Sequence, residues 1–180
     1  MAVATQVRKW TLEEVHRLPE DGNKYELVRG ELFVSPPPSI EHETIAARLN
    51  GILAPYVAAN ALGLVYRPKA VMRFEGSEVE PDLMVRLPHP SPRNSDRDWN
   101  TAPVPILVAE ILSPYSRRRD FGEKKRLYLD AGVAEYWIVD PDDRSITVEQ
   151  GKGTRTERNQ LIWAPLGATA PLTFDVASVF

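Results

Sequence analysis

The 180-residue chain contains no cysteine. This absence excludes disulfides, thiolate zinc sites, iron–sulfur clusters and a cysteine nucleophile, and it fits a reducing compartment. Histidine is also scarce, because the chain has only His16, His42 and His89, and these lie far apart in the sequence. The sequence therefore excludes cysteine chemistry and argues against a histidine-rich metal cluster.

Long apolar runs and an excess of positive charge are missing as well. No segment approaches the roughly 18 apolar residues of a membrane helix, and the N-terminus lacks a basic-then-apolar signal pattern. We therefore expect a cytoplasmic protein without a membrane partner. The net charge of −3 provides no global positive field, so a nucleic-acid role would need a local basic patch. With 43% hydrophobic and 26% charged residues, the composition is that of one globular domain over residues 1–180.

The order of apolar patterns predicts an α+β fold with a mixed central sheet flanked by helices, an α/β/α arrangement. A strand at 105–113, a helix from 116 to about 131 and a strand at 135–139 should form a right-handed crossover. We expect Pro55 to kink or end the second helix. The other expected elements are a helix start at 10–14, hairpins at 25–34 and 145–161, a helix at 39–59, strands at 63–66, 70–74 and 80–86, and a loop at 88–105.

Two carboxylates occupy positions where burial would be costly. Glu110 lies in the middle of the most apolar strand, and Asp82 follows Pro81 at the start of another strand. A buried glutamate needs a partner, and two converging carboxylates repel each other unless a cation lies between them. Oxygen ligands of this kind suit Mg²⁺ or Mn²⁺. Each residue could instead form an isolated salt bridge.

The helix after Glu110 carries Asp120, Lys124 and Tyr128 at i, i+4 and i+8, which places them on one helical face. One interpretation is a surface pair between Asp120 and Lys124. The other is that Lys124 points to the carboxylates, because this helix directly follows the Glu110 strand.

Five motifs in order resemble the bacterial "putative restriction endonuclease" family of the PD-(D/E)XK nuclease-like superfamily. The resemblance covers roughly residues 20–150. The motifs are Tyr25-Glu-Leu-Val-Arg-Gly-Glu-Leu32 with the helix near His42, Pro81-Asp82, Glu110-Ile-Leu-Ser-Pro114, the Asp120/Lys124/Tyr128 series, and Gly132-Val-x-Glu-Tyr-Trp-x-Val-Asp-Pro141.

The resemblance implies a restriction-endonuclease-like core and a Mg²⁺- or Mn²⁺-dependent endonuclease acting on DNA. Asp82 and Glu110 correspond to the metal-binding acids. The superfamily lysine lies two residues after the second acid, where this chain has Leu112, and its counterpart here is Lys124 on the following helix. Glu31 resembles an additional acidic ligand, although it could equally be an exposed hairpin charge. His42 occupies a family-like position, but a lone histidine there is more often a cap or a packing residue.

Basic residues cluster on the same helix, and they could contact DNA phosphates or form a solvated face. The candidates are Arg117, Arg118, Arg119 and Lys125, with Lys124 and Arg126 beside them and Arg86, Arg93 and Arg97 around the long loop. Two other functions remain open, a degenerate nuclease fold used as a binding or regulatory module and a phosphoesterase of small nucleotides. Because duplex cleavage commonly uses two sites, we also expect a homodimer, with Trp163, Leu172 and Phe174 offering a partner surface.

Overall fold

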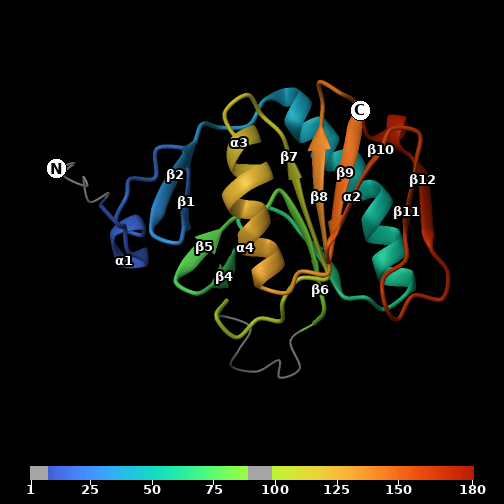
Figure 1. Ribbon diagram of the computed structural model, residues 1–180, viewed down its shortest axis with the longest axis horizontal. Coiled ribbons are helices and arrows are strands. Elements are labelled where there is room, and N and C mark those ends of the chain that lie inside the picture. The colour runs from blue at the N-terminus through green and yellow to red at the C-terminus, as the bar shows by residue number, and fades with distance from the viewer. Residues whose placement is uncertain (1–7, 89–98) are drawn as a thin grey trace.

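A six-stranded mixed sheet forms the centre of the protein, whose computed structural model describes residues 8–88 and 99–180. Its strand order is β10-β9-β8-β7-β6-β3 (Figure 1). The pair β7–β8 is parallel and the other neighbours are antiparallel, so the expected mixed sheet is confirmed. The strands are β3 (Leu64–Tyr66), β6 (Leu83–Arg86), β7 (Leu107–Ile111), β8 (Glu135–Asp140), β9 (Ser145–Gln150) and β10 (Gly153–Glu157).

Two smaller sheets flank the central one at opposite ends of the molecule (Figure 1). One has the order β2-β1-β5-β4, and the other pairs β11 with β12. Their strands are β1 (Lys24–Val28), β2 (Glu31–Ser35), β4 (Met72–Phe74), β5 (Ser77–Val79), β11 (Gln160–Trp163) and β12 (Leu172–Asp175). The helices are α1 (Leu12–Val15), α2 (Ile40–Ala59), α3 (Arg117–Arg119), the π-helical turn η1 (Asp120–Lys124), α4 (Lys125–Asp130) and the 3₁₀ turn η2 (Val176–Val179).

Helices cover both faces of the central sheet, which explains why its strands are apolar on both sides. On one face, α2 packs Leu49 and Leu53 against residues such as Leu107 and Trp137. On the other face, Leu127 of α4 packs in a second apolar cluster with Val108 and other residues. Figure 1 shows α4 and α2 on opposite sides of the strands. The expected position of the Glu110 strand at the centre of the sheet, with the 117–131 helix packed on it, is confirmed.

The register between β6 and β7 fixes the relation of the two candidate carboxylates. Met84 pairs with Val108 and Leu83 with Ala109 in this antiparallel ladder. One residue further along, the same register sets Asp82 opposite Glu110. Residues opposite each other point to the same face of a sheet. Asp82 and Glu110 therefore both face the side covered by α4.

The helix α2 does not end at Pro55, which was one of the two expected effects, but continues through this residue to Ala59. The start at Ser39 is as predicted, since the Ser39 hydroxyl accepts a hydrogen bond from the main chain of His42. A proline removes the bond to the carbonyl four residues earlier, here that of Gly51. Both Pro55 and Gly51 are exposed, so water can satisfy this carbonyl and the helix need not end.

The hairpin at β1–β2 turns through Arg29 and Gly30, which both have positive φ, of 51° and 87°. Positive φ at both central residues is the conformation of a type I′ turn. The hairpin predicted from the Arg-Gly pair between apolar runs is confirmed. A second hairpin was missed, because β5 lies between the expected strands at 70–74 and 80–86. Glu75 and Gly76 form its turn, again with positive φ at both residues.

The C-terminal segment packs on its own chain, which corrects one expectation. Trp163 is buried against Trp137 and Tyr56, and Phe174 also contacts Trp137. These aromatic side chains complete the core that α2 covers. Trp163 and Phe174 therefore do not offer a partner surface. The expected homodimer is no longer supported by these two aromatic residues.

The structure contains no helix in residues 8–88 and 99–180 with the length and apolar character needed to cross a membrane. The predicted loop at 88–105 is irregular from Trp99 onward, whereas Arg93 and Arg97 lie outside the described residues.

Candidate active site

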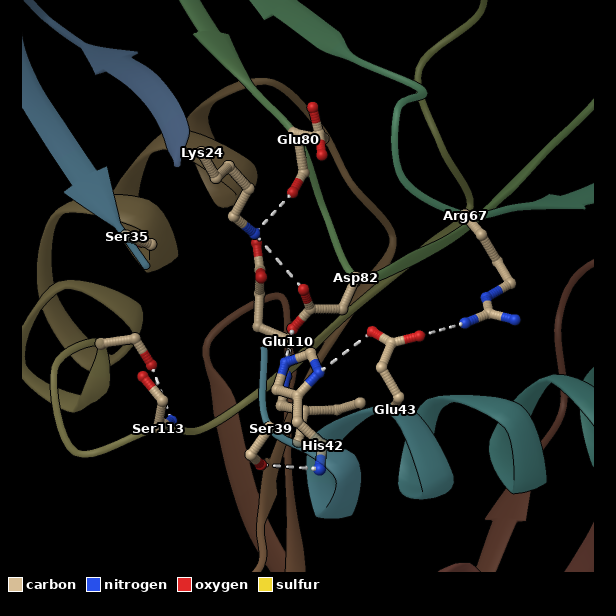
Figure 2. Close-up of polar contacts among 12 residues, drawn as sticks. Lys24, Ser35, Ser39, His42, Glu43, Arg67, Glu80, Asp82, Glu110 and Ser113 are labelled. Carbon is tan, nitrogen blue, oxygen red and sulfur yellow. Dashed lines mark hydrogen bonds and ion pairs between the residues drawn. The ribbon is translucent and has the colours of Figure 1, made fainter. Parts of the chain in front are cut away.

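A cleft of about 960 Å³ lies where β1, the start of α2, the β6–β7 edge and the η1 turn meet. It brings together charged side chains from segments far apart in the sequence. Figure 2 shows several of them converging on Asp82. The buried or half-buried charged residues that line it are Lys24, Glu26, His42, Glu78, Glu80, Asp82, Glu110, Arg119, Asp120 and Lys124.

Asp82 is held by contacts to both carboxylate oxygens. Its Oδ2 accepts the main-chain N–H of Ile111 at 2.8 Å and lies 3.0 Å from His42 Nε2. Its Oδ1 lies 3.3 Å from the Nζ of Lys24. Burial alone would raise the pKa of Asp82, but Lys24 and the hydrogen bond from His42 outweigh it and hold that pKa well below its usual range. Asp82 is therefore a carboxylate at neutral pH.

Glu110 is buried under the helix side of the sheet, as the sequence led us to expect. Its Oε1 accepts the Tyr128 hydroxyl and lies 2.5 Å from the Nζ of Lys124. Burial raises the pKa of Glu110 to about 7, with Lys124 opposing the shift and Asp82 adding to it. The positive charge near Glu110 thus does not offset the effect of burial, and Glu110 ionises less readily than an exposed glutamate.

Lys124 lies between two buried carboxylates. Its Nζ contacts the Oε1 and Oε2 of Glu26 at 2.9 and 3.2 Å in addition to Glu110. Burial would lower the pKa of Lys124, but Glu110 and Glu26 outweigh it and raise that pKa. Asp120, Lys124 and Tyr128 are all buried, and Lys124 and Tyr128 both contact Glu110, so Lys124 points to the carboxylates and does not form a surface pair.

The π-helical turn η1 covers the segment from Asp120 to Lys124. Such turns place an extra residue in a helix and recur at functional sites. Here the turn begins at Asp120 and ends at Lys124, and both residues line the cleft. The sequence predicted a continuous helix, and its 3.6-residue pattern gave no signal for the wider turn.

The structure does not bring every predicted residue to the cleft. Glu31 is exposed at the start of β2 and is absent from the cleft wall, which Glu26 of the preceding strand supplies instead. Arg117 and Arg119 line the cleft, whereas Arg118 is exposed outside it. Lys125 also lies outside the cleft wall, at 2.7 Å from Glu149.

The predicted basic patch is partly neutralised within the chain. Arg117 contacts Asp140 at 2.7 Å, and Arg126 contacts Glu123 at 3.2 Å. Arg119 donates to the Ser35 hydroxyl and stacks over Phe33. The helix face therefore offers less free positive charge than its composition indicates.

Sequence reasoning missed Lys24 and Glu26, which both come from β1. Glu26 had the same signal as Glu110, because it is a charge followed by the apolar pair Leu27-Val28 in a strand. Lys24 precedes this run at the edge of the strand and had no comparable signal. His42, which the sequence left open, lies at the cleft and contacts Asp82.

The donor set suits a hard cation. Four buried carboxylates, those of Glu26, Asp82, Glu110 and Asp120, line the cleft together with two ammonium groups, those of Lys24 and Lys124. Across residues 8–88 and 99–180, however, no three acidic or histidine side chains converge in a closed metal site. Mg²⁺ is commonly bound by one or two carboxylates, with water and substrate phosphates as its other ligands. Asp82 and Glu110 fit that second arrangement.

The chain also matches known proteins. The model of the Uma2 family, described as "Putative restriction endonuclease", matches residues 12–172. The chain belongs to the Uma2 family. The family resemblance of the sequence motifs is thereby confirmed. No curated protein matches the chain significantly.

A solved structure has the same fold as this Uma2 chain. It comes from Anabaena variabilis and is described as "a putative nuclease belonging to DUF820". It is 22% identical, covers 95% of this chain and 97% of its own, and superimposes with a TM-score of 0.77. At this identity the match shows the fold, and the nuclease description belongs to that protein.

The raised pKa of Glu110 predicts a pH dependence of stability. Between the ordinary value of 4.5 and about 7, the folded chain keeps a proton at Glu110 that the unfolded chain has lost. The free energy of unfolding should therefore fall as the pH rises through this window. Glu110→Gln imitates the protonated group and does not lose this stability. The free energy of unfolding of the variant, relative to that of the wild type, should therefore increase by about 1–3 kcal/mol between low and neutral pH. Urea denaturation with a chelator present measures this difference, and a constant difference would contradict it.

Proposed function

We propose that this chain is a Mg²⁺- or Mn²⁺-dependent endonuclease that hydrolyses phosphodiester bonds in DNA. One observation carries the proposal: Asp82 and Glu110, from adjacent strands, face the same cleft with Lys124 beside them. Membership of the Uma2 family and the fold of the related structure support it.

The proposed reaction is hydrolysis at phosphorus. A water molecule loses a proton to solvent as its oxygen attacks the phosphorus, the bond from phosphorus to the leaving sugar oxygen breaks, and that oxygen takes up a proton from solvent. Asp82 and Glu110 would hold the cation, which neutralises charge on the phosphate and makes a water more acidic.

The chain's own residues keep these two carboxylates in place. His42 and the Ile111 N–H orient Asp82, while Tyr128 and Lys124 orient Glu110. These carboxylates therefore need little reorganisation when the substrate binds. Such preorganisation of charged groups makes the largest contribution to the rate enhancement of many enzymes.

For the DNA strand, we propose phosphate contacts from the arginines at the cleft mouth. Arg117 and Arg119 line the cleft and Arg118 is exposed on the same turn of helix. Lys125 would add a contact only by leaving Glu149. Because phosphate contacts release counterions, binding through these groups should weaken steeply with salt.

Metal removal tests the proposal directly. Purified protein should nick supercoiled plasmid with Mg²⁺ or Mn²⁺, and excess EDTA should abolish nicking. A single-stranded oligonucleotide and a small phosphodiester, assayed in parallel, define the substrate. Mn²⁺ binding without cleavage of any of them would support the binding module, and cleavage of the small diester alone would support the phosphoesterase.

We further propose a homodimer, because cutting both strands of a duplex commonly uses two sites. Light scattering at high protein concentration should then return twice the chain mass of 20.2 kDa. A single-chain mass at every concentration would contradict this.

A further inference from the structure

The two lysines of the cleft differ in access to solvent. The Lys124 side chain is 2% exposed, whereas that of Lys24 is 22% exposed. Both carry raised pKa values, because burial, which would lower them, is outweighed by the surrounding carboxylates. Both are therefore ammonium groups at neutral pH, and they differ in what each can reach.

Lys124 is enclosed by carboxylates, because it donates two hydrogen bonds to Glu26 and forms an ion pair with Glu110. An ammonium group has three donors. The contacts of Lys124 at 2.5, 2.9 and 3.2 Å go to three carboxylate oxygens of Glu110 and Glu26. To contact a substrate phosphate, Lys124 would have to break its ion pairs with two buried carboxylates, those of Glu26 and Glu110.

Lys24 is held more loosely. Its Nζ donates to the main-chain oxygen of Glu80 at 3.0 Å and to Asp82 Oδ1 at 3.3 Å. The second distance is long for a charge-assisted bond, for which about 2.7–2.9 Å is usual. Within the described residues these contacts occupy two of its three donors. Figure 2 shows the Lys24 side chain reaching toward Glu80 and Asp82.

We propose that Lys24 is a catalytic residue that donates a hydrogen bond to a nonbridging oxygen of the scissile phosphate, with Lys124 serving as the fixed counter-charge of Glu110 and Glu26. This proposal rests on the proposed function and assigns the phosphate contact to a residue outside the family motifs. The Lys24 ammonium is adjacent to Asp82, is half-buried, and has a third donor that no group in residues 8–88 and 99–180 accepts.

The position of Lys24 has a consequence for the cation. Oδ2 of Asp82 is taken by His42 and by the Ile111 N–H, so Oδ1 is the oxygen most open to a cation. Lys24 occupies that oxygen at 3.3 Å. A cation and Lys24 therefore compete for Asp82, and a bound cation would release the Lys24 ammonium toward the phosphate.

Substitution of Lys24 separates catalysis from metal binding. Lys24→Met keeps the apolar stem and removes the charge. Plasmid nicking should fall by about a hundredfold or more, as for loss of one transition-state donor. Mn²⁺ affinity, measured by calorimetry without DNA, should tighten by roughly twofold to fivefold because a competing cation is gone. Opposite effects on cleavage and on metal affinity are not expected of a residue that only supports the fold.

Two further variants control the result. Lys24→Arg keeps the charge and should recover part of the nicking, and Lys152→Ala removes an exposed lysine in the β9–β10 turn and should behave as wild type. Thermal melting of each variant with EDTA verifies folding. Lys24→Met that nicks like wild type, or that loses Mn²⁺ binding together with cleavage, would overturn the inference. A wild-type protein that cleaves no substrate would instead overturn the proposed function, and this inference with it.

Discussion

Lys124→Ala should lower the free energy of unfolding by about 3–5 kcal/mol, because it leaves the buried carboxylates of Glu26 and Glu110 without their shared counter-charge. Urea denaturation at neutral pH with EDTA measures the loss. Glu110 can respond by taking up a proton, since its pKa is already about 7. Glu26 has less freedom, because Lys124 and Lys24 outweigh burial and hold its pKa below the usual range in the wild type.

Metal should reverse part of this loss. If Mn²⁺ binds between the carboxylates, it replaces some of the missing positive charge, and it stabilises the fold by mass action. The gain in melting temperature on adding Mn²⁺ should therefore be larger for Lys124→Ala than for wild type. Lys152→Ala, at an exposed position, is the matched control. A Lys124→Ala protein as stable as wild type would show that Lys124 does not serve as the buried counter-charge.

Asp82→Asn should reduce plasmid nicking by at least about a hundredfold, since it removes the charge of one of the two proposed cation ligands. The amide keeps an oxygen that can accept the Ile111 N–H and the His42 contact, so the fold should be retained. Mn²⁺ affinity, measured by calorimetry, should fall in parallel with nicking.

The matched control for this variant is Asp142→Asn, at the rim of the same cleft. The Asp142 side chain is 95% exposed and contacts Arg117 only at 4.0 Å. Its loss should leave both nicking and Mn²⁺ affinity as in the wild type. Equal effects of the two variants would mean that Asp82 contributes only to the general negative charge of the cleft.

The sequence predicted the central part of the site because those residues break a local pattern. Glu110 interrupts an apolar strand, and Lys124 follows at a spacing that fixes its helical face. The conflict between charge and burial was visible without the fold. The crossover of strand, helix and strand then restricted where these residues could lie.

The remainder depended on contacts between distant segments. Lys24 and Glu26 reach the cleft because the small sheet of β1 lies beside the β6–β7 edge, and no local periodicity specifies that packing. Glu31 was favoured from its motif alone, but the hairpin places it on the exposed side. The early helix end considered at Pro55 does not occur, because water can satisfy the exposed Gly51 carbonyl that the proline leaves without a helical partner.

The ion pairs of the cleft join residues far apart along the chain. Lys124 is 98 residues from Glu26, and Asp82 is 58 residues from Lys24 and 40 from His42. During synthesis the carboxylates of Glu26 and Glu110 both emerge before Lys124, the lysine that they share. Domains fold as units once enough chain is available, so these two acids lack this counter-charge until translation has passed η1. A growing chain thus cannot complete its charge cluster before Lys124 has been synthesised.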